Sequence, residues 1–142
     1  MNALETEKTM ISSSKFLEAV YSSSDNFIIC TTKSEYIPME DFQNHFNTIG
    51  SFIKKNKTVK FIFDKTSLKV FHQPSMEWYH TVWKKEMANY GLKSYRKILP
   101  NLQYFKMSVK IGKERIIKEN PDFKFEDYDI QYYDTLKEAI LY

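Results

Sequence analysis

Hydrophobic and polar positions follow one period near the start of the chain and another further on. Two short apolar runs, 16–21 and 27–32, lie on either side of the turn-forming segment 22–26, which predicts an antiparallel hairpin. From Pro38 onward the apolar residues recur at steps of three and four, which predicts an amphipathic helix. Its buried stripe is expected to consist of Met39, Phe42, Phe46, Ile49 and Ile53.

The rest of the chain alternates between apolar runs and helical patterns. The five residues beginning at Val59 are nearly all apolar and precede Asp64, which is typical of a strand buried on both faces of a parallel sheet. Helices are predicted over 75–90, 102–119 and 135–141, and strands over 95–99 and 129–133. The resulting order, β-β-α-β-α-β-α-β-α, predicts an α/β fold with a mixed, mostly parallel sheet and right-handed crossover helices.

Length and composition suit one domain. The 142 residues are 42% hydrophobic, which is enough to bury a core, and no linker-like segment divides them. Residues 1–14 are polar and end in a serine run, so they predict a flexible tail before a single domain over 15–142. The lone Cys30 excludes an internal disulfide, the first residues lack a signal-peptide core, and no apolar run reaches the roughly 18 residues of a membrane span. These features predict a cytoplasmic protein without a membrane span.

An apolar strand that ends in Asp64, a loop to Pro74, Trp78 on the next helix and Gly91 before another strand form a weak pattern. Together with the element order and the closing passage 133–139, this pattern resembles the STAS family, and within it the SpoIIAA-like group. The resemblance covers the whole predicted domain. It implies a four- to five-stranded mixed sheet with helices packed mainly on one face, and a regulatory or ligand-sensing binding module in place of an enzyme.

The best-known STAS proteins are anti-sigma-factor antagonists, which are switched by phosphorylation of a serine in a turn after the central strand. Here Asp64 matches the acid at the end of that strand, while the glycine of the turn is absent and the loop is longer. The resemblance implies Ser75, near the start of the second helix, as the candidate phosphorylation site, where a phosphate would meet free backbone N–H groups. The alternative is that Ser75 only caps or begins this helix.

Ligands of open α/β sheets bind outside the carboxyl ends of the parallel strands. This rule predicts a ligand or partner site after the central strand and the strand that follows it, at Asp64, Lys65, Thr66, Ser67, His72, Ser75 and Asn101. Phe71, Trp78 and Tyr79 would supply apolar walls. In the competing interpretation, the polar side chains satisfy backbone groups of the loop and the aromatic residues belong to the core.

Patterns typical of catalysis or metal binding are absent from the sequence. His45, His72 and His80 are not spaced as metal ligands, and glycine-rich phosphate loops and Gly-x-Ser-x-Gly elbows are missing. We therefore expect no catalytic residue, no cofactor and no metal. A small hydrolase stays an alternative, and it would require a coupled His–Asp or His–Ser pair, for example His72 with Asp64.

The net charge of +3 conceals an uneven distribution. Segment 84–118 carries ten basic and two acidic side chains, whereas 119–142 carries two basic and seven acidic. Lys106, Lys110 and Lys113 share one face of the third helix, so the basic segment could bind nucleic acid or another polyanion, or the two segments could neutralise each other. No nucleic-acid-binding motif accompanies the basic patch, so nucleic acid is the less favoured partner.

The sequence thus favours a non-enzymatic regulatory module that binds a protein partner or a small ligand through the loop 64–75 and the second helix. Polyanion binding by 84–118 and hydrolysis of an unidentified substrate are the alternatives. Tyrosine- and phenylalanine-rich strands at the edge of the sheet leave a homodimer open.

Overall fold

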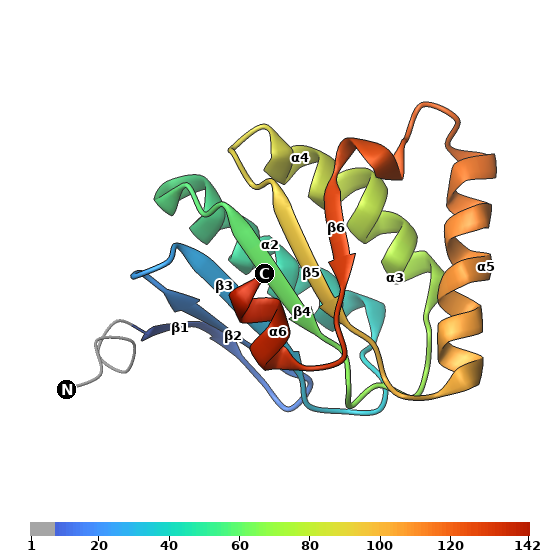
Figure 1. The fold of residues 1–142 in the computed structure, drawn as a ribbon, viewed down its shortest axis with the longest axis horizontal. Helices are drawn as coiled ribbons and strands as arrows, with labels where there is room; N and C mark the ends of the chain where they lie inside the picture. The colour runs from blue at the N-terminus through green and yellow to red at the C-terminus, as the bar shows by residue number, and fades with distance from the viewer. Residues whose placement is uncertain (1–7) are drawn as a thin grey trace.

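The computed structural model of the protein describes residues 8–142, which form a six-stranded mixed sheet with helices on both faces (Figure 1). The strands follow one another across the sheet in chain order, from β1 to β6. The first three pair antiparallel, and β3 to β6 pair parallel. The elements are β1 (Lys8–Ser13), β2 (Leu17–Ser22), β3 (Phe27–Thr32), α2 (Met39–Asn56), β4 (Lys60–Asp64), α3 (Gln73–Trp78), η1 (Tyr79–Lys84), α4 (Lys85–Ala88), β5 (Ser94–Ile98), α5 (Gln103–Glu119), η2 (Phe125–Asp127), β6 (Asp129–Tyr132) and α6 (Leu136–Leu141).

The α/β class and the mixed sheet are confirmed, but the start of the chain differs from the predicted flexible tail. Lys8–Ser13 form β1, which pairs with β2 and adds a sixth strand to the four or five expected. Most of these side chains are polar or exposed, so no apolar alternation indicates a strand in the sequence. His45 of α2 helps to hold this region, because its Nδ1 bonds to Ser12 and its Nε2 bonds to Ser14 at 2.7 Å. The part of the predicted tail over 1–7 lies outside the described residues.

The predicted interior strand is confirmed. β4 lies between β3 and β5 and is parallel to both. Phe61 and Phe63 belong to the core under α2, and Ile62 belongs to the smaller core on the other face, where Ala139 of α6 packs. All three β4 side chains are buried, because helices cover both faces of the sheet at this position (Figure 1). Val59 precedes the strand and is exposed.

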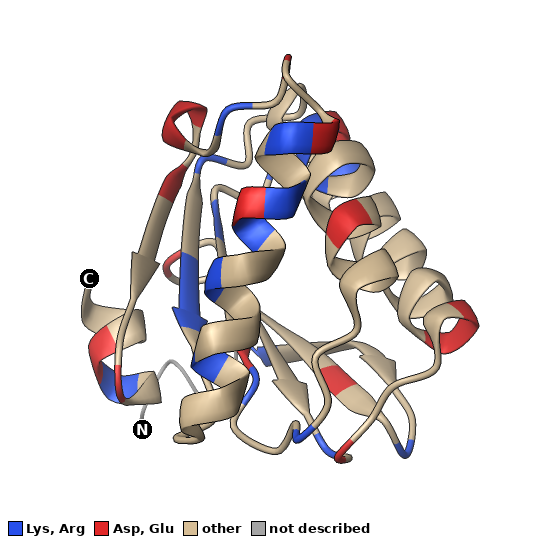
Figure 2. Cartoon of the chain, turned by 90° about the vertical axis from the view of Figure 1, so that its right-hand side faces the viewer, with Lys and Arg blue, Asp and Glu red and all other residues tan. Residues whose placement is uncertain are grey.

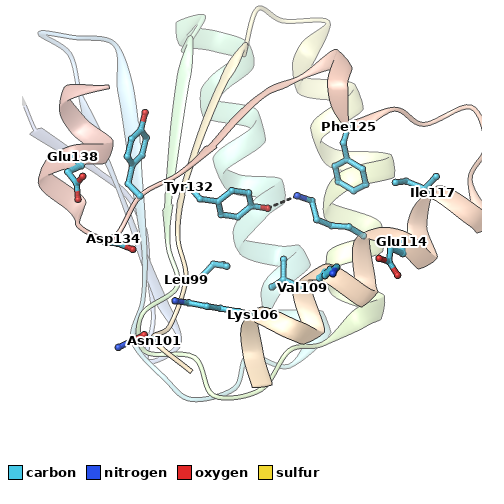
Figure 3. A pocket seen from close by; sticks show the side chains of 13 residues that line it. Leu99, Asn101, Lys106, Val109, Glu114, Ile117, Phe125, Tyr132, Asp134 and Glu138 are labelled. Atoms are coloured by element: carbon cyan, nitrogen blue, oxygen red, sulfur yellow. Dashed lines mark hydrogen bonds between the residues drawn. The ribbon is translucent and has the colours of Figure 1, made fainter. Parts of the chain in front are cut away.

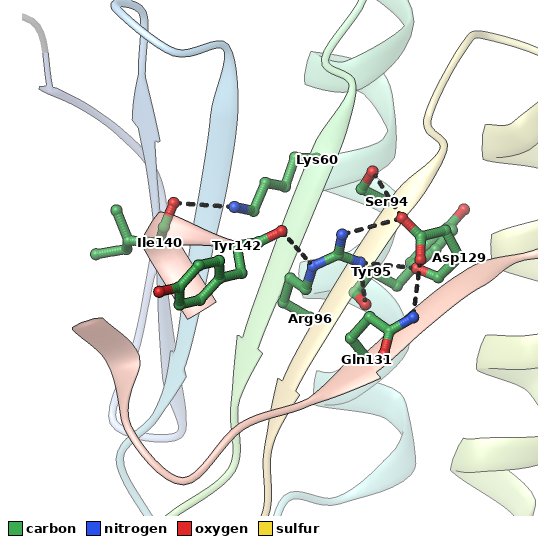
Figure 4. Close-up of polar contacts among 8 residues, drawn as sticks. All are labelled: Lys60, Ser94, Tyr95, Arg96, Asp129, Gln131, Ile140 and Tyr142. Atoms are coloured by element: carbon green, nitrogen blue, oxygen red, sulfur yellow. Dashed lines mark hydrogen bonds and ion pairs between the residues drawn. The ribbon is translucent and has the colours of Figure 1, made fainter. Parts of the chain in front are cut away.

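The crossover helices lie on one face of the sheet, and α6 lies on the other (Figure 1). α6 contacts β4 and β5. Two long basic side chains hold it there, since Lys60 Nζ donates to the carbonyl of Ile140 and Arg96 Nε donates to the carbonyl of Tyr142, both at 3.0 Å (Figure 4). Arg96 also pairs with Asp129 of β6 at 2.9 Å, so it links the last strand and the last helix to the sheet.

The second predicted helix departs from α geometry in its middle. It runs as α3, η1 and α4 without interruption, and η1 is a π-helix over Tyr79–Lys84. The apolar residues at helical spacing in the predicted helix 75–90 are buried at Met76, Tyr79, Trp83 and Met87, whereas Tyr90 is exposed. Because a π turn holds more residues than an α turn, it also places His80 and Lys84 in the interior.

The third predicted helix, α5, lies at the margin of the sheet (Figure 1). Phe105, Gly112 and Ile116 are buried, whereas Leu102, just before the helix, and Val109 are only partly buried. Gly112 of α5 lies so close to the segment just before α3 that a Cβ added at Gly112 would lie 2.7 Å from the ring of Phe71. In the part of the chain that the structure describes, no helix combines the length and apolar character needed to cross a membrane.

Candidate functional site

The polar residues predicted for the loop after β4 bond to one another. Asp64 Oδ1 accepts from the backbone N–H of Thr66 at 3.1 Å and from its hydroxyl at 2.8 Å. His72 is the N-cap of α3, and its Nδ1 lies 3.4 Å from the backbone nitrogen of Ser75 and 2.8 Å from the Ser75 hydroxyl. These contacts favour the interpretation in which the loop residues satisfy local backbone groups.

The same geometry tests two chemical roles considered for this loop, phosphorylation of Ser75 and hydrolysis by a coupled pair that includes His72. Ser75 is only 2% exposed and its hydroxyl bonds to His72, the N-cap, so Ser75 belongs to the first turn of α3 and a kinase would have to open that turn first. Of the two pairs that a hydrolase could use, the His–Asp pair of His72 with Asp64 is not formed, because Asp64 bonds to Thr66, whereas a His–Ser pair is formed by His72 Nδ1 and the buried Ser75 hydroxyl at 2.8 Å. Ser67 is exposed, and it lines neither of the two cavities described below.

A large cavity lies elsewhere, between α5, β6 and the start of α6 (Figure 3). We call it the outer cavity, and its volume is about 1090 Å³. It is lined by Leu99, Asn101, Lys106, Val109, Lys110, Lys113, Glu114, Ile117, Phe125, Tyr132, Tyr133, Asp134 and Glu138. The predicted residue Asn101 and the three predicted lysines of α5 are therefore brought together here, away from the 64–75 loop.

A second, much smaller cavity adjoins the first and is called the inner cavity. Its volume is about 10 Å³, close to what a single water molecule requires. The two cavities share the residues Leu99, Val109, Lys113 and Tyr132. At this boundary Lys113 Nζ donates to the hydroxyl of Tyr132 at 2.9 Å, which is the dashed line in Figure 3.

Four buried basic side chains lie at or behind the inner cavity, and we call them the amine cluster. Its members are Lys65 after β4, His80 and Lys84 of η1, and Lys97 of β5, each no more than 4% exposed. Lys97 Nζ lies 3.4 Å from His80 Nε2, and Lys65 Nζ lies 3.3 Å from Met76 Sδ. Of the residues predicted in the 64–75 loop, Lys65 and Phe71 line the inner cavity, and the Lys65 amine lies against the thioether of Met76 and the ring of Phe63.

The positive charge of the amine cluster has no acidic counterpart nearby. Among residues 8–142, no carboxylate lies within ion-pairing distance of Lys65, Lys84, Lys97 or Lys113. Lys84 Nζ instead faces three aromatic rings, at 5.1 Å from Tyr79, 4.5 Å from Tyr95 and 5.4 Å from Tyr128. Tyrosine faces offset only part of the cost of burying a charge, so the cluster is electrostatically unsatisfied.

Burial and mutual repulsion shift the proton equilibria of the cluster. Burial lowers the pKa of Lys65 from 10.5 to about 8. Burial lowers the pKa of Lys97 well below its usual range, and the neighbouring Lys84, Lys65 and Lys113 lower it further. The pKa of His80 falls for the same reasons, burial first and then the surrounding lysines. Burial therefore disfavours the charged form of each of these groups, and a nearby anion would favour it.

The sequence analysis placed Lys65 in the predicted ligand site and Lys84 and Lys97 in the basic segment, and named His80, but gave the four residues no common site. Lys97 lies in the predicted strand 95–99, which the structure places between β4 and β6, where lysine is rarely buried without a partner. The burial of His80 and Lys84 depends on the π turn, which no apolar periodicity indicates. Among the described residues, no group of three or more His, Cys, Asp or Glu side chains is placed to hold a metal ion.

The basic segment 84–118 does not form one continuous surface. Lys84, Arg96 and Lys97 are buried, and the lysines of α5 face acidic residues beside β6 and in α6 (Figure 2). This arrangement fits the expectation that the basic and acidic segments neutralise each other in part. No protein-family model, curated protein or solved structure shows a detectable match to the chain.

Proposed function

We propose that the chain is a STAS-like, non-enzymatic module that binds a small ligand carrying one anionic head group, and that the ligand occupies the outer cavity. The single observation that carries this proposal is the amine cluster, which places four buried basic side chains, with no acidic partner among the described residues, at or behind the inner end of a cavity. The STAS part of the proposal is supported by the sequential strand order and by crossover helices on one face.

The head group would lie at the boundary between the two cavities. Lys113 Nζ and the Tyr132 hydroxyl line both cavities and already bond to each other, so both are in place to bond to an anion. Lys65 and Lys97 lie behind them, where low polarity strengthens the attraction of a negative charge. The inner cavity itself is too small for a phosphate or carboxylate, so the head group stops at this boundary.

The walls of the outer cavity indicate what the rest of the ligand is like. Leu99, Val109, Ile117 and Phe125 offer apolar surface, which suits a small organic body. The rim carries three acidic residues, Glu114, Asp134 and Glu138, beside the three lysines of α5. This mixed rim disfavours a long polyanion such as nucleic acid, because acidic side chains would face its phosphates.

Inorganic phosphate tests the head-group site. The thermal midpoint of the full chain is measured in phosphate and in potassium chloride of equal ionic strength, with Lys113→Met and Lys118→Met as matched variants. Both lysines are on α5, but Lys113 lines the cavities and Lys118 is exposed elsewhere. We expect phosphate to raise the midpoint of the unmodified chain and of Lys118→Met, and to lose this effect in Lys113→Met. An equal rise in all three proteins would mean that phosphate acts only through general exclusion from the surface, and the proposal would be rejected.

A further inference from the structure

The head-group position at the cavity boundary separates an apolar end of the outer cavity from a polar end. The apolar end contains Ile117 and Phe125, which lie to the right of the dashed bond in Figure 3. The polar end lies to the left of this bond and contains Asn101, Lys106 and Asp134. Leu99 and Val109 line both cavities and lie between the two ends. An apolar ligand body therefore finds apolar surface to cover in one direction and charged groups in the other.

The apolar end begins directly beside the head-group amine. Lys113 Nζ lies 5.3 Å from the ring centroid of Phe125. The rings of His80 and Phe123 hold this ring in place, since the centroid of each lies 4.9 Å from its own. Ile117 is 50% exposed although its side chain is apolar. A ligand that covered Ile117 would remove apolar surface from water, which favours binding.

The two donors at the boundary match a carboxylate. Lys113 Nζ donates to the Tyr132 hydroxyl at 2.9 Å and has further N–H groups to donate. The hydroxyl accepts in this bond, so its own O–H is left to donate to a ligand. Two donors side by side suit the two oxygens of one carboxylate.

Helix α5 sets the length of the apolar end. Ile117 follows Lys113 by four residues, which is about one turn and about 6 Å along the helix axis. An alkyl chain of about five to seven carbons that starts at the head group reaches Ile117 or just past it. The wall ends there, because no residue of α5 after Ile117 lines the cavity.

We propose that the outer cavity binds a straight-chain monocarboxylate of about six to eight carbons. Its carboxylate bonds to Lys113 and Tyr132, and its chain lies along Phe125 and Ile117. This ligand class rests on the proposed function, to which it adds the chemistry of the head group and the direction and length of the body. The polar end of the cavity stays hydrated when the ligand is bound.

Glu114 gives the apolar end a further selectivity. It lines the outer cavity near Ile117 (Figure 3), and no lysine or arginine of the described residues forms an ion pair with it. A second carboxylate at the far end of the ligand chain would be repelled by Glu114. Hexanoate should therefore bind more tightly than adipate, the dicarboxylate of the same length.

Ligand-detected NMR titrations of the full chain at pH 7 measure the affinity for acetate, butyrate, hexanoate, octanoate and decanoate. We expect the affinity to rise about threefold with each added methylene from butyrate to octanoate, and to level off at decanoate. Hexylammonium has the same chain as a bound carboxylate but the opposite head-group charge, so it should not bind. An affinity that does not depend on chain length would overturn the inference.

Ile111→Ala is the matched control for Ile117→Ala. Both isoleucines are exposed on α5, at 57% and 50%, but of the two only Ile117 lines the outer cavity. Ile117→Ala should weaken octanoate binding by about threefold or more and leave acetate binding unchanged, whereas Ile111→Ala should change neither. Equal effects of the two substitutions on octanoate binding would place the chain elsewhere and refute the proposed direction.

Recognition of the chain and recognition of the anion can fail independently. If phosphate stabilises the protein through Lys113 but affinity does not rise with chain length, the monocarboxylate is refuted and the proposed function stands. If octanoate and hexylammonium bind equally well, and Lys113→Met still binds both, the cavity recognises apolar surface alone. In that case both the monocarboxylate and the proposed function are rejected.

Discussion

Replacing Lys65 with methionine should stabilise the folded chain at neutral pH. The Lys65 side chain is 3% exposed, and its Nζ lies 3.3 Å from Met76 Sδ and 4.8 Å from the ring centroid of Phe63. These neighbours are apolar, and they lower the pKa of the amine from 10.5 to about 8 by removing it from water. Methionine has a similar length and no charge, so it fits the same surroundings.

The size of the gain follows from the pKa of Lys65. One pKa unit corresponds to 1.36 kcal/mol, so holding the proton on buried Lys65 costs the folded state about 3 kcal/mol at pH 7. The folded chain binds fewer protons at this site than the unfolded chain between about pH 8 and pH 10.5. The stability of the unmodified chain should therefore rise with pH across this window, and the advantage of the variant should shrink there.

Urea unfolding followed by tryptophan fluorescence measures this difference in a phosphate-free buffer. We expect the free energy of unfolding of Lys65→Met to exceed that of the unmodified chain by about 3 kcal/mol at pH 7 and by about 1 kcal/mol at pH 10. Lys118→Met, which removes an exposed lysine, should change stability by no more than about 0.5 kcal/mol at either pH. A Lys65→Met chain that is less stable at pH 7, or a difference that does not depend on pH, would refute the reasoning.

Four further substitutions test the fold around the site by urea unfolding. Arg96→Ala should lower the free energy of unfolding by about 3 kcal/mol, because it removes a buried guanidinium that bonds to three backbone carbonyls. Asp129→Ala should lower it by less than about 1 kcal/mol, because that carboxylate is 47% exposed. An equal cost would show that the ion pair, and not the carbonyl bonds, holds β6 and α6. Gly112→Ala should destabilise by about 1–3 kcal/mol, since its Cβ would lie 2.7 Å from the ring of Phe71, and a neutral result would mean that α5 packs more loosely. His72→Ala should cost about 1 kcal/mol through loss of the α3 cap, and no loss would contradict the capping role.

Much of the fold could be predicted because its pattern is local. The stripe of α2 and the apolar run of β4 have clear periods, and both elements lie where the sequence predicts them. β1 could not be predicted, because pairing with β2 and the contacts of His45 stabilise a segment that is mostly polar. A strand of this kind depends on distant residues, which a local pattern does not contain.

The site was predicted only in part, for a similar reason. The rule that ligands bind at the carboxyl ends of strands pointed to Asn101, which lines the outer cavity, and also to Asp64 and Thr66, which bond to each other. The amine cluster depends on two features that the sequence does not display. One is the π turn that buries His80, and the other is the distance of every described carboxylate from Lys97.

If the proposed function is correct, an anion binds at the boundary between the two cavities, beside the amine cluster. The pKa of Lys65 tests it most directly, because this buried amine has a pKa of about 8 when no anion is bound. The titration can be followed by NMR of lysine labelled with carbon-13 at Cε, with and without phosphate, and Lys65→Met identifies the signal. We expect phosphate to raise the pKa of Lys65, since a nearby negative charge favours the protonated amine. A pKa that phosphate leaves unchanged would contradict it.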